Sequence, residues 1–181
     1  MKAYAGIGSR STPPETLAMM RQFAHELARR GWTLRSGAAD GADRAFEEGA
    51  YDAVMSEPRL PKPQIFLPWP SFNEGSRVMV LKRYYVSEPQ PEAFDIAARF
   101  HPAWDRCKRG AKALHARNVH QILGPDVTAP DLSRFVLCWT PAASGSGGTG
   151  QAIRIAQAYE VPVFDLATHG LTDRIVDRLF T

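Results

Sequence analysis

The sequence predicts an α/β protein with a three-layer α/β/α architecture, in which a mainly parallel sheet of about five or more strands lies between helices. Short apolar runs alternate along the chain with longer segments whose apolar residues recur at helical spacing. Three of the runs lead into glycine-rich turns, at residues 6–10, 36–43 and 145–150. Strands that alternate with helices pair in parallel through right-handed crossovers.

Residues that start and stop regular structure bound the individual elements. A helix is expected after Pro13-Pro14, because the missing proline N–H costs little in a first helical turn. Gly31 ends this helix, and the run at 134–139 is apolar enough for a strand buried on both faces. In order, the expected elements are strand Lys2–Ile7, helix Glu15–Arg30, strand Trp32–Arg35, helix Gly41–Val54, strand Gln64–Leu67, helices Pro89–Phe100 and Trp104–Val119, strand Arg134–Trp139, helix Gly148–Tyr159, strand Pro162–Asp165 and helix Leu171–Phe180.

A single domain is expected over residues 1–181, since this length suits one full core. Residues 71–130 interrupt the alternation because they contain no clear strand. We expect them to form a helical insertion over one edge of the sheet or over the mouth of a site.

Composition narrows the class of protein. Hydrophobic residues make up 44% and charged residues 23%, and no apolar run approaches the length of a membrane span. The chain begins directly with a strand-like segment, so no signal peptide and a cytoplasmic location are expected. Cys107 and Cys138 are far apart in the sequence and do not form a CxxC pattern. The sequence also has no set of four Cys or His residues at the spacing of a structural zinc site. Reduced thiols and no structural metal site are therefore expected. The net charge of +3 fits an anionic ligand without demanding nucleic acid.

The three glycine-rich turns should meet at one edge of the sheet, where parallel α/β folds bind ligands. Helix N-termini there present N–H groups and a partial positive charge, and glycine lets the backbone approach closely. The best phosphate cradle is Gly147, Gly148, Thr149 and Gly150, with the Thr149 hydroxyl as an extra donor. The alternative is that these glycines serve only tight turns and helix–strand packing.

Polar side chains at the turns complete the candidate site. Arg10 could pair bidentately with a phosphate, or form a surface salt bridge. Asp40 and Asp43 are the candidate catalytic residues, because either could hold a ribose diol or act as a general base; helix capping is the alternative. Trp69 could stack on a base or simply pack. The other expected ligand contacts are Gly8, Ser9, Ser36, Gly37, Arg117, Asn118 and Thr140, and His115 and Gln121 lie at helical spacing from the pair at 117–118.

Several nucleotide-related classes are disfavoured. No GxxxxGK[ST] motif occurs, which argues against a P-loop NTPase, and no GxGxxG follows the first strand, which argues against a standard dinucleotide dehydrogenase. Ser144 and Ser146 have no evident histidine partner, so no nucleophile–base triad is visible.

The turn sequences resemble the SLOG superfamily of Rossmann-like nucleotide-binding proteins, which includes the DNA-processing protein DprA/Smf and the LOG cytokinin-activating hydrolases. The similarity rests on Tyr4-Ala5-Gly6-Ile7-Gly8-Ser9-Arg10, Ser36-Gly37-Ala38-Ala39-Asp40-Gly41-Ala42-Asp43 and Gly147-Gly148-Thr149-Gly150-Gln151-Ala152. Together with His115-Ala116-Arg117-Asn118 and Gln121, they look most like small stand-alone DprA-like proteins of phages and prophages.

This resemblance implies a protein that binds a small nucleotide or nucleotide-derived ligand, and leaves open whether it is an enzyme. One alternative is a nucleotide N-glycosidase or phosphoribohydrolase-like hydrolase; however, Ala152 stands where LOG enzymes have a catalytic Glu, and Ser144 where their motif has Pro. The other is a DprA-like mediator of recombination that binds single-stranded DNA. Carboxylates near a phosphate could recruit Mg²⁺. A homo-oligomer, in particular a dimer, is expected because related folds pair through helices.

Overall fold

Six strands form one sheet in the order β4-β3-β2-β1-β5-β6 in a computed structural model that describes residues 1–75, 85–145 and 147–180. Every neighbouring pair is parallel, and the central strand β1 pairs with both β2 and β5. The strands are β1 (Ala3–Gly6), β2 (Thr33–Ser36), β3 (Gln64–Leu67), β4 (Tyr85–Ser87), β5 (Val136–Cys138) and β6 (Val163–Asp165). The predicted α/β class and parallel sheet are confirmed.

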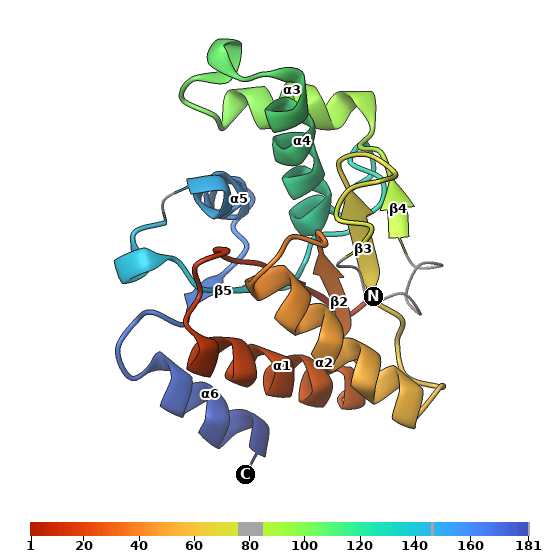
Figure 1. Cartoon of the computed structure of the whole chain (residues 1–181), viewed down its shortest axis with the longest axis vertical. Coiled ribbons are helices and arrows are strands. Elements are labelled where there is room, and N and C mark those ends of the chain that lie inside the picture. The colour runs from red at the N-terminus through yellow and green to blue at the C-terminus, as the bar shows by residue number, and fades with distance from the viewer. Residues whose placement is uncertain (76–84, 146, 181) are drawn as a thin grey trace.

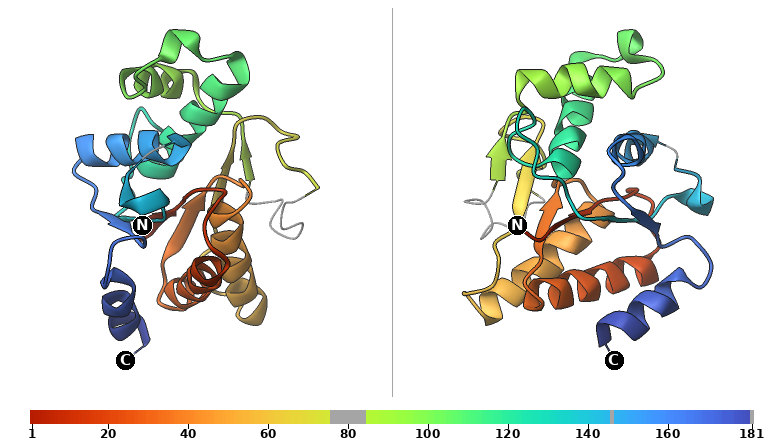
Figure 2. Two further views of the ribbon diagram at one scale, coloured as in Figure 1. Left: turned by 60° about the vertical axis from the view of Figure 1, so that its left-hand side comes forward. Right: turned by 180° about the vertical axis from the view of Figure 1, so that it is seen from behind.

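Helices cover both faces of this sheet (Figures 1 and 2). Alternate residues of β1 point to opposite faces, because side chains alternate along a strand. Tyr4 belongs to the apolar cluster that contains the buried residues of two long helices, and Ala5 belongs to the cluster beneath two others. The helices on the Tyr4 face are α1 (Pro14–Arg29) and α2 (Ala42–Ser56), and α6 (Leu171–Phe180) lies beside α1. The helices on the Ala5 face are α4 (Arg109–Leu123) and α5 (Gly147–Ala158), and α3 (Pro91–Arg99) packs on α4.

The region 71–130 differs from its expected form. The expectation that it contains no strand is wrong, because β4 pairs with β3 through Ile65 and Tyr85. β4 has three residues, Tyr85–Ser87, and unlike β5 and β6 it does not lie within a longer apolar run that would indicate a strand. Residues 76–84 of the region lie outside the described part of the chain.

Helix α4 is a layer of the fold, because Ala116, Val119 and Ile122 are fully buried in the core beneath the sheet. It begins at Arg109, later than the expected Trp104. The segment 104–106 is instead a short 3₁₀ turn, and extended backbone at Cys107 and Lys108 separates the turn from the helix. This extended break carries the chain from α3 to the start of α4.

The order of the strands reverses at β1. The chain first steps from β1 outward to β4 and then returns to place β5 on the opposite side of β1. The loop after β1 therefore leads to one face of the sheet and the loop after β5 to the other, which opens a crevice beyond the carboxyl ends of the two strands. Backbone hydrogen bonds of Ile7 N–H to Leu137 O (3.1 Å) and of Ser9 N–H to Trp139 O (3.1 Å) hold these strand ends together.

Within the described residues, no helix combines the length and apolar character that crossing a membrane would require.

Candidate functional site

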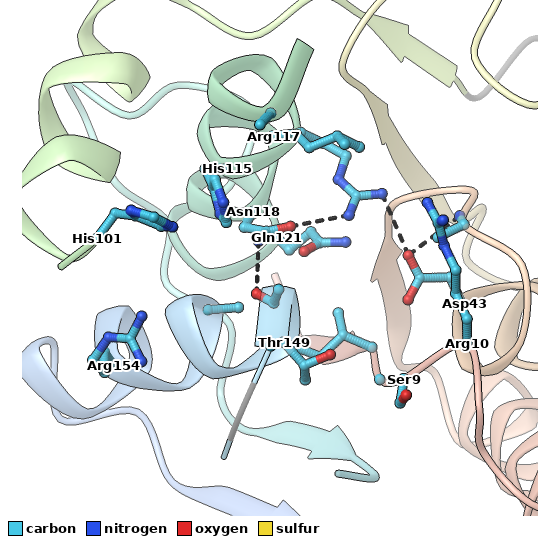
Figure 3. Close-up of a pocket in the computed structure, with 18 of the residues that line it drawn as sticks. Ser9, Arg10, Asp43, His101, His115, Arg117, Asn118, Gln121, Thr149 and Arg154 are labelled. Atoms are coloured by element: carbon cyan, nitrogen blue, oxygen red, sulfur yellow. Dashed lines mark hydrogen bonds and ion pairs between the residues drawn. The ribbon is translucent and has the colours of Figure 1, made fainter. Parts of the chain in front are cut away.

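A cavity of about 650 Å³ opens at this reversal point (Figure 3). Its walls come from the turn after β1, the turn after β2 with the start of α2, the cavity-facing side of α4, the first turns of α5, and the segment that follows α3. Nine of the residues expected to contact a ligand or act in catalysis line it: Gly8, Ser9, Arg10, Asp43, Arg117, Asn118, Gly147, Gly148 and Thr149. The three glycine-rich turns therefore meet at one cavity, as the parallel topology requires.

The glycines of the turns fall into two kinds. A Cβ on Gly8 would lie 2.6 Å from the Cβ of Ala42, and one on Gly150 would lie 1.8 Å from the carbonyl oxygen of Gly145. Both are spacings that real Cβ atoms do not adopt, so Gly8 and Gly150 are required by packing. A Cβ on Gly147 or Gly148 would instead meet no atom of the described residues within 4 Å. Gly147 has a φ of +70°, which favours glycine for conformational reasons. Gly148 has neither explanation, and the space beside it belongs to the cavity.

The first turn of α5 lies at the cavity, since Gly147, Gly148 and Thr149 all line it. The first N–H groups of a helix have no carbonyl four residues earlier to bond to, and the helix dipole places partial positive charge there. This end of the helix is therefore suited to an anion.

A buried ion pair joins the second turn to α4. The guanidinium Nη1 of Arg117 lies 3.4 Å from the Oδ2 of Asp43, and both side chains are more than nine-tenths buried. Arg117 Nη1 also donates to the carbonyl oxygen of Gly37. Burial raises the pKa of Asp43, and the Arg117 charge together with N–H donors of the turns opposes that rise. Burial likewise lowers the pKa of Arg117, against the pull of Asp43. Each charge needs the other, because an unpaired buried charge is costly.

Asn118 extends this arrangement to the opposite wall. Its Oδ1 accepts a hydrogen bond from Arg117 Nη2 at 3.0 Å. Its Nδ2 donates to the carbonyl oxygen of Gly148 at 3.2 Å and to the Oε1 of Gln151 at 3.1 Å. Both amide hydrogens of Asn118 are thereby used within the protein. Asn118 is therefore a positioning residue, which fixes the first turn of α5 relative to the second glycine turn.

Two buried side chains on α4 retain a donor without a partner among the described residues, Arg117 at its Nε and Gln121 at its Nε2. The side chain of Gln121 is 1% exposed. A buried amide without a partner costs free energy, and such atoms in native structures are uncommon. Because Gln121 lines the cavity, a ligand atom could accept this hydrogen bond.

Six residues of the predicted site do not line this cavity: Ser36, Gly37, Asp40, Trp69, Thr140 and Gly150. Ser36 is buried and donates its hydroxyl to the carbonyl oxygen of Gly6 at 2.7 Å, which ties β2 to β1. Thr140 is also buried, its hydroxyl bonds to Asp165, and its Oγ1 accepts from Gly145 N–H at 3.0 Å.

Asp40 and Trp69 lie elsewhere on the molecule. Asp40 is exposed and does not line the cavity, so of the two candidate catalytic residues the cavity contains Asp43. The ring of Trp69 packs edge-on against Phe72 with centroids 5.2 Å apart. This is the packing role that the sequence left open for Trp69.

The cavity also contains residues that sequence reasoning missed. His101 comes from the segment after α3, and Arg154 lies two turns into α5 with its Nε donating to the carbonyl oxygen of Phe100 at 2.9 Å. Helical spacing from Gly147 could have indicated Arg154, because residues seven apart share a face of a helix. His101 gives no comparable signal, since the fold of α3 onto α4 places it there.

The cavity walls carry a cationic excess. The described lining residues include three arginines, Arg10, Arg117 and Arg154, and one carboxylate, Asp43. Arg10 and Arg154 are exposed, whereas Arg117 is neutralised by Asp43. The two exposed guanidinium groups are therefore free to attract an anion to the cavity mouth.

Comparisons with known proteins agree with this architecture. A family described as DNA recombination-mediator protein A matches residues 1–57, which hold the first two glycine turns. A search of curated proteins found no match. DNA processing protein A from Helicobacter pylori, whose structure is described for its single-stranded DNA binding mode, matches with 18% identity and a TM-score of 0.54 over 98% of this chain and 72% of its own.

Two further solved structures share the fold. The structural genomics target TM1055 matches with 16% identity and a TM-score of 0.51, over 98% of this chain and 81% of its own. DprA from Streptococcus pneumoniae matches with 13% identity and a TM-score of 0.51, over 98% of this chain and 56% of its own. These matches fit the SLOG superfamily that the sequence resembles, and they support a DNA-processing or nucleotide-binding Rossmann-like protein.

Proposed function

We propose that this protein binds a small nucleotide or nucleotide-derived ligand, with a phosphate at the first turn of α5. The observation that carries the proposal is Gly148, a helical glycine whose missing side chain neither packing nor backbone conformation explains. Glycine destabilises a helix relative to alanine by up to about 1 kcal/mol. Its presence beside a cavity supports a ligand that approaches the backbone too closely for a methyl group.

Charge and size support the same ligand class. Arg10 and Arg154 offer positive charge near the cavity mouth, and the helix N-terminus adds its dipole. A volume of about 650 Å³ falls within the usual range for small-molecule sites. The unused Gln121 Nε2 supplies a neutral donor for an acceptor atom of the same ligand.

Calorimetric titration tests the proposal most directly. A nucleoside 5′-monophosphate, the diphosphate and ADP-ribose would each be compared with the unphosphorylated nucleoside. Phosphate-dependent binding is expected, weakened by salt because it depends on exposed charges. Arg10→Gln should reduce the affinity about tenfold, the loss of one charge-assisted hydrogen bond, whereas Arg59→Gln, at an exposed site outside the cavity, should not. Absence of binding by every phosphorylated ligand would contradict the proposal.

Single-stranded DNA is the second candidate ligand. The match to the DNA recombination-mediator family and the DNA-binding description of the Helicobacter pylori protein favour it. Two phosphates paired with Arg10 and Arg154 would give a slope of log affinity against log salt of about −1.4, and Arg154→Gln would reduce its size by about 0.7. Binding of an oligonucleotide with this salt dependence, together with indifference to mononucleotides, would favour DNA over the nucleotide.

Hydrolysis of an N-glycosidic bond requires a general acid or base, and Asp43 could act as one. Asp43 is the carboxylate among the described lining residues, and burial raises its pKa. Its ion pair with Arg117 and the alanine at position 152 weigh against this role. Release of free base from a nucleoside monophosphate, abolished by Asp43→Asn, would establish it.

A further inference from the structure

His101, Cys107 and His115 gather beside the cavity, although the first and the last are 14 positions apart in sequence. One nitrogen of each histidine and the sulfur of Cys107 lie within 4.8 Å of one another. The extended break before α4 makes this possible, because it places Cys107 between the end of α3 and the first turns of α4. All three side chains are half-buried.

The distances suit a tetrahedral metal ion. The Cys107 sulfur lies 3.7 Å from Nδ1 and 3.8 Å from Nε2 of His101. Zinc bonds of about 2.0 Å to nitrogen and about 2.3 Å to sulfur, at tetrahedral angles, place these two ligand atoms about 3.5 Å apart. The rings of His101 and His115 have centroids 4.3 Å apart. Small side-chain adjustments would therefore bring all three donors onto one ion.

The hydrogen bonds around His115 leave its second nitrogen free to bind a metal. Gln151 Nε2 donates to the carbonyl oxygen of Ala97 at 3.3 Å, which turns Oε1 of Gln151 toward Asn118 and His115. His115 Nδ1 lies 3.3 Å from that Oε1 and must donate to it, because the amide oxygen only accepts. In the neutral ring the lone pair then lies on Nε2. Metal-binding histidines commonly have their other nitrogen held by an oxygen in this way.

The hydrogen bonds around His101 also leave one of its nitrogens for a metal. At His101, Ala103 N–H donates to Nδ1 at 3.2 Å, which makes Nδ1 an acceptor and places the ring proton on Nε2. A metal at Nδ1 would replace this contact and leave that proton in place.

We propose that His101, Cys107 and His115 form a zinc site with one open position toward the cavity. Imidazole and thiolate are both ligands that zinc binds, and three protein ligands with a fourth open position are typical of a reactive or substrate-binding zinc site rather than a structural one. His101 and His115 both line the cavity, so the open position faces the space in which a ligand would lie. A water molecule or an anionic oxygen would complete the coordination, and Arg154 beside His115 favours the anion.

Metal binding alone tests this site, without any nucleotide. The protein would be stripped with a chelator, titrated with Co²⁺ and then with Zn²⁺, and compared with three variants. A 1:1 complex is expected, with a thiolate-to-cobalt charge-transfer absorption that Zn²⁺ abolishes by displacement. Cys107→Ser should remove this absorption. His101→Gln should weaken Zn²⁺ binding more than about 100-fold, because loss of a residue that only orients a ligand usually costs less than that.

His169→Ala is the matched control, because His169 is exposed and outside the cluster, so it should bind metal as the unaltered protein does. Circular dichroism would confirm that each variant is folded. Failure of the folded protein to bind Co²⁺ or Zn²⁺ at 1:1, or an unchanged charge-transfer absorption in Cys107→Ser, would overturn the assignment. Neither result depends on whether the cavity binds nucleotides, so the two proposals fail separately.

Discussion

Replacing Gly148 with alanine should stabilise the fold and weaken ligand binding at the same time. Alanine is the better helix former, and a methyl group at this position would contact no atom within 4 Å in the part of the chain that the structure describes. The methyl group would occupy the space over the first turn of α5, where the proposed phosphate approaches the backbone. The two effects have opposite signs because they arise from different neighbours, the helix itself and the ligand.

The sizes of both effects can be worked from the local geometry. The gain in helix propensity is at most about 1 kcal/mol, which for a chain of this length raises Tm by about 2–4 °C. Displacing a phosphate from one charged hydrogen bond to the backbone costs about 1.5–3 kcal/mol. The dissociation constant should therefore rise by roughly 10- to 150-fold.

Gly110→Ala is a matched control for this experiment. Gly110 is also the second residue of its helix, α4, and a Cβ there would make an ordinary contact at 3.8 Å with the ring of Trp69, away from the cavity. Thermal unfolding and calorimetric titration of both variants would be measured under one condition. If Gly148→Ala bound nucleotide as tightly as Gly110→Ala, the cradle would not be at α5 and the reasoning from the missing side chain would be refuted.

Three other substitutions follow from the contacts of single residues. Gly8→Ala should lower the unfolding free energy by about 1–3 kcal/mol in urea denaturation, because its Cβ would lie 2.6 Å from that of Ala42; an unchanged midpoint would contradict this packing role. Asn118→Ala should weaken nucleotide binding because the carbonyl of Gly148 loses its donor, and calorimetry that detects no change would show that α5 is positioned by other contacts. Burial lowers the pKa of His120 from 6.5, so this histidine binds a proton less readily in the folded state than in the unfolded state. The free energy of unfolding should therefore decrease as pH falls below about 6.5. His120→Gln should reduce that dependence by up to about 1.4 kcal/mol per pH unit, and identical pH profiles of unfolding would refute the assignment.

The sequence predicted the sheet and the meeting of the turns because both follow from periodicity and topology. Apolar runs and helical spacing located five of the six described strands, and parallel pairing then brings residues far apart in sequence, such as Gly8 and Gly148, to one edge. The prediction failed at β4, because its three residues do not lie within an apolar run of the kind that marks the other strands.

Which side chains line the cavity was harder to predict, because the position of a residue beside a turn does not determine where its side chain points. Ser36 and Thr140 stand at strand ends like Ser9, yet both are buried and do not line the cavity, whereas Ser9 does. His101 and Cys107 are assembled by the packing of α3 on α4, a long-range event that no local spacing records. The expected dimer and phage origin stay predictions.

Two adjacent residues of α4 form hydrogen bonds with opposite walls of the cavity. Arg117 bonds to Gly37 and Asp43 on one wall, and Asn118 bonds to Gly148 on the other. The distance between the two walls is therefore set by two neighbouring residues of one helix, whose Cα atoms are about 3.8 Å apart. Surrounding loops could lengthen or shorten during evolution without altering that distance. One residue inserted into α4 just before this pair would instead rotate it by about 100° and release both walls together.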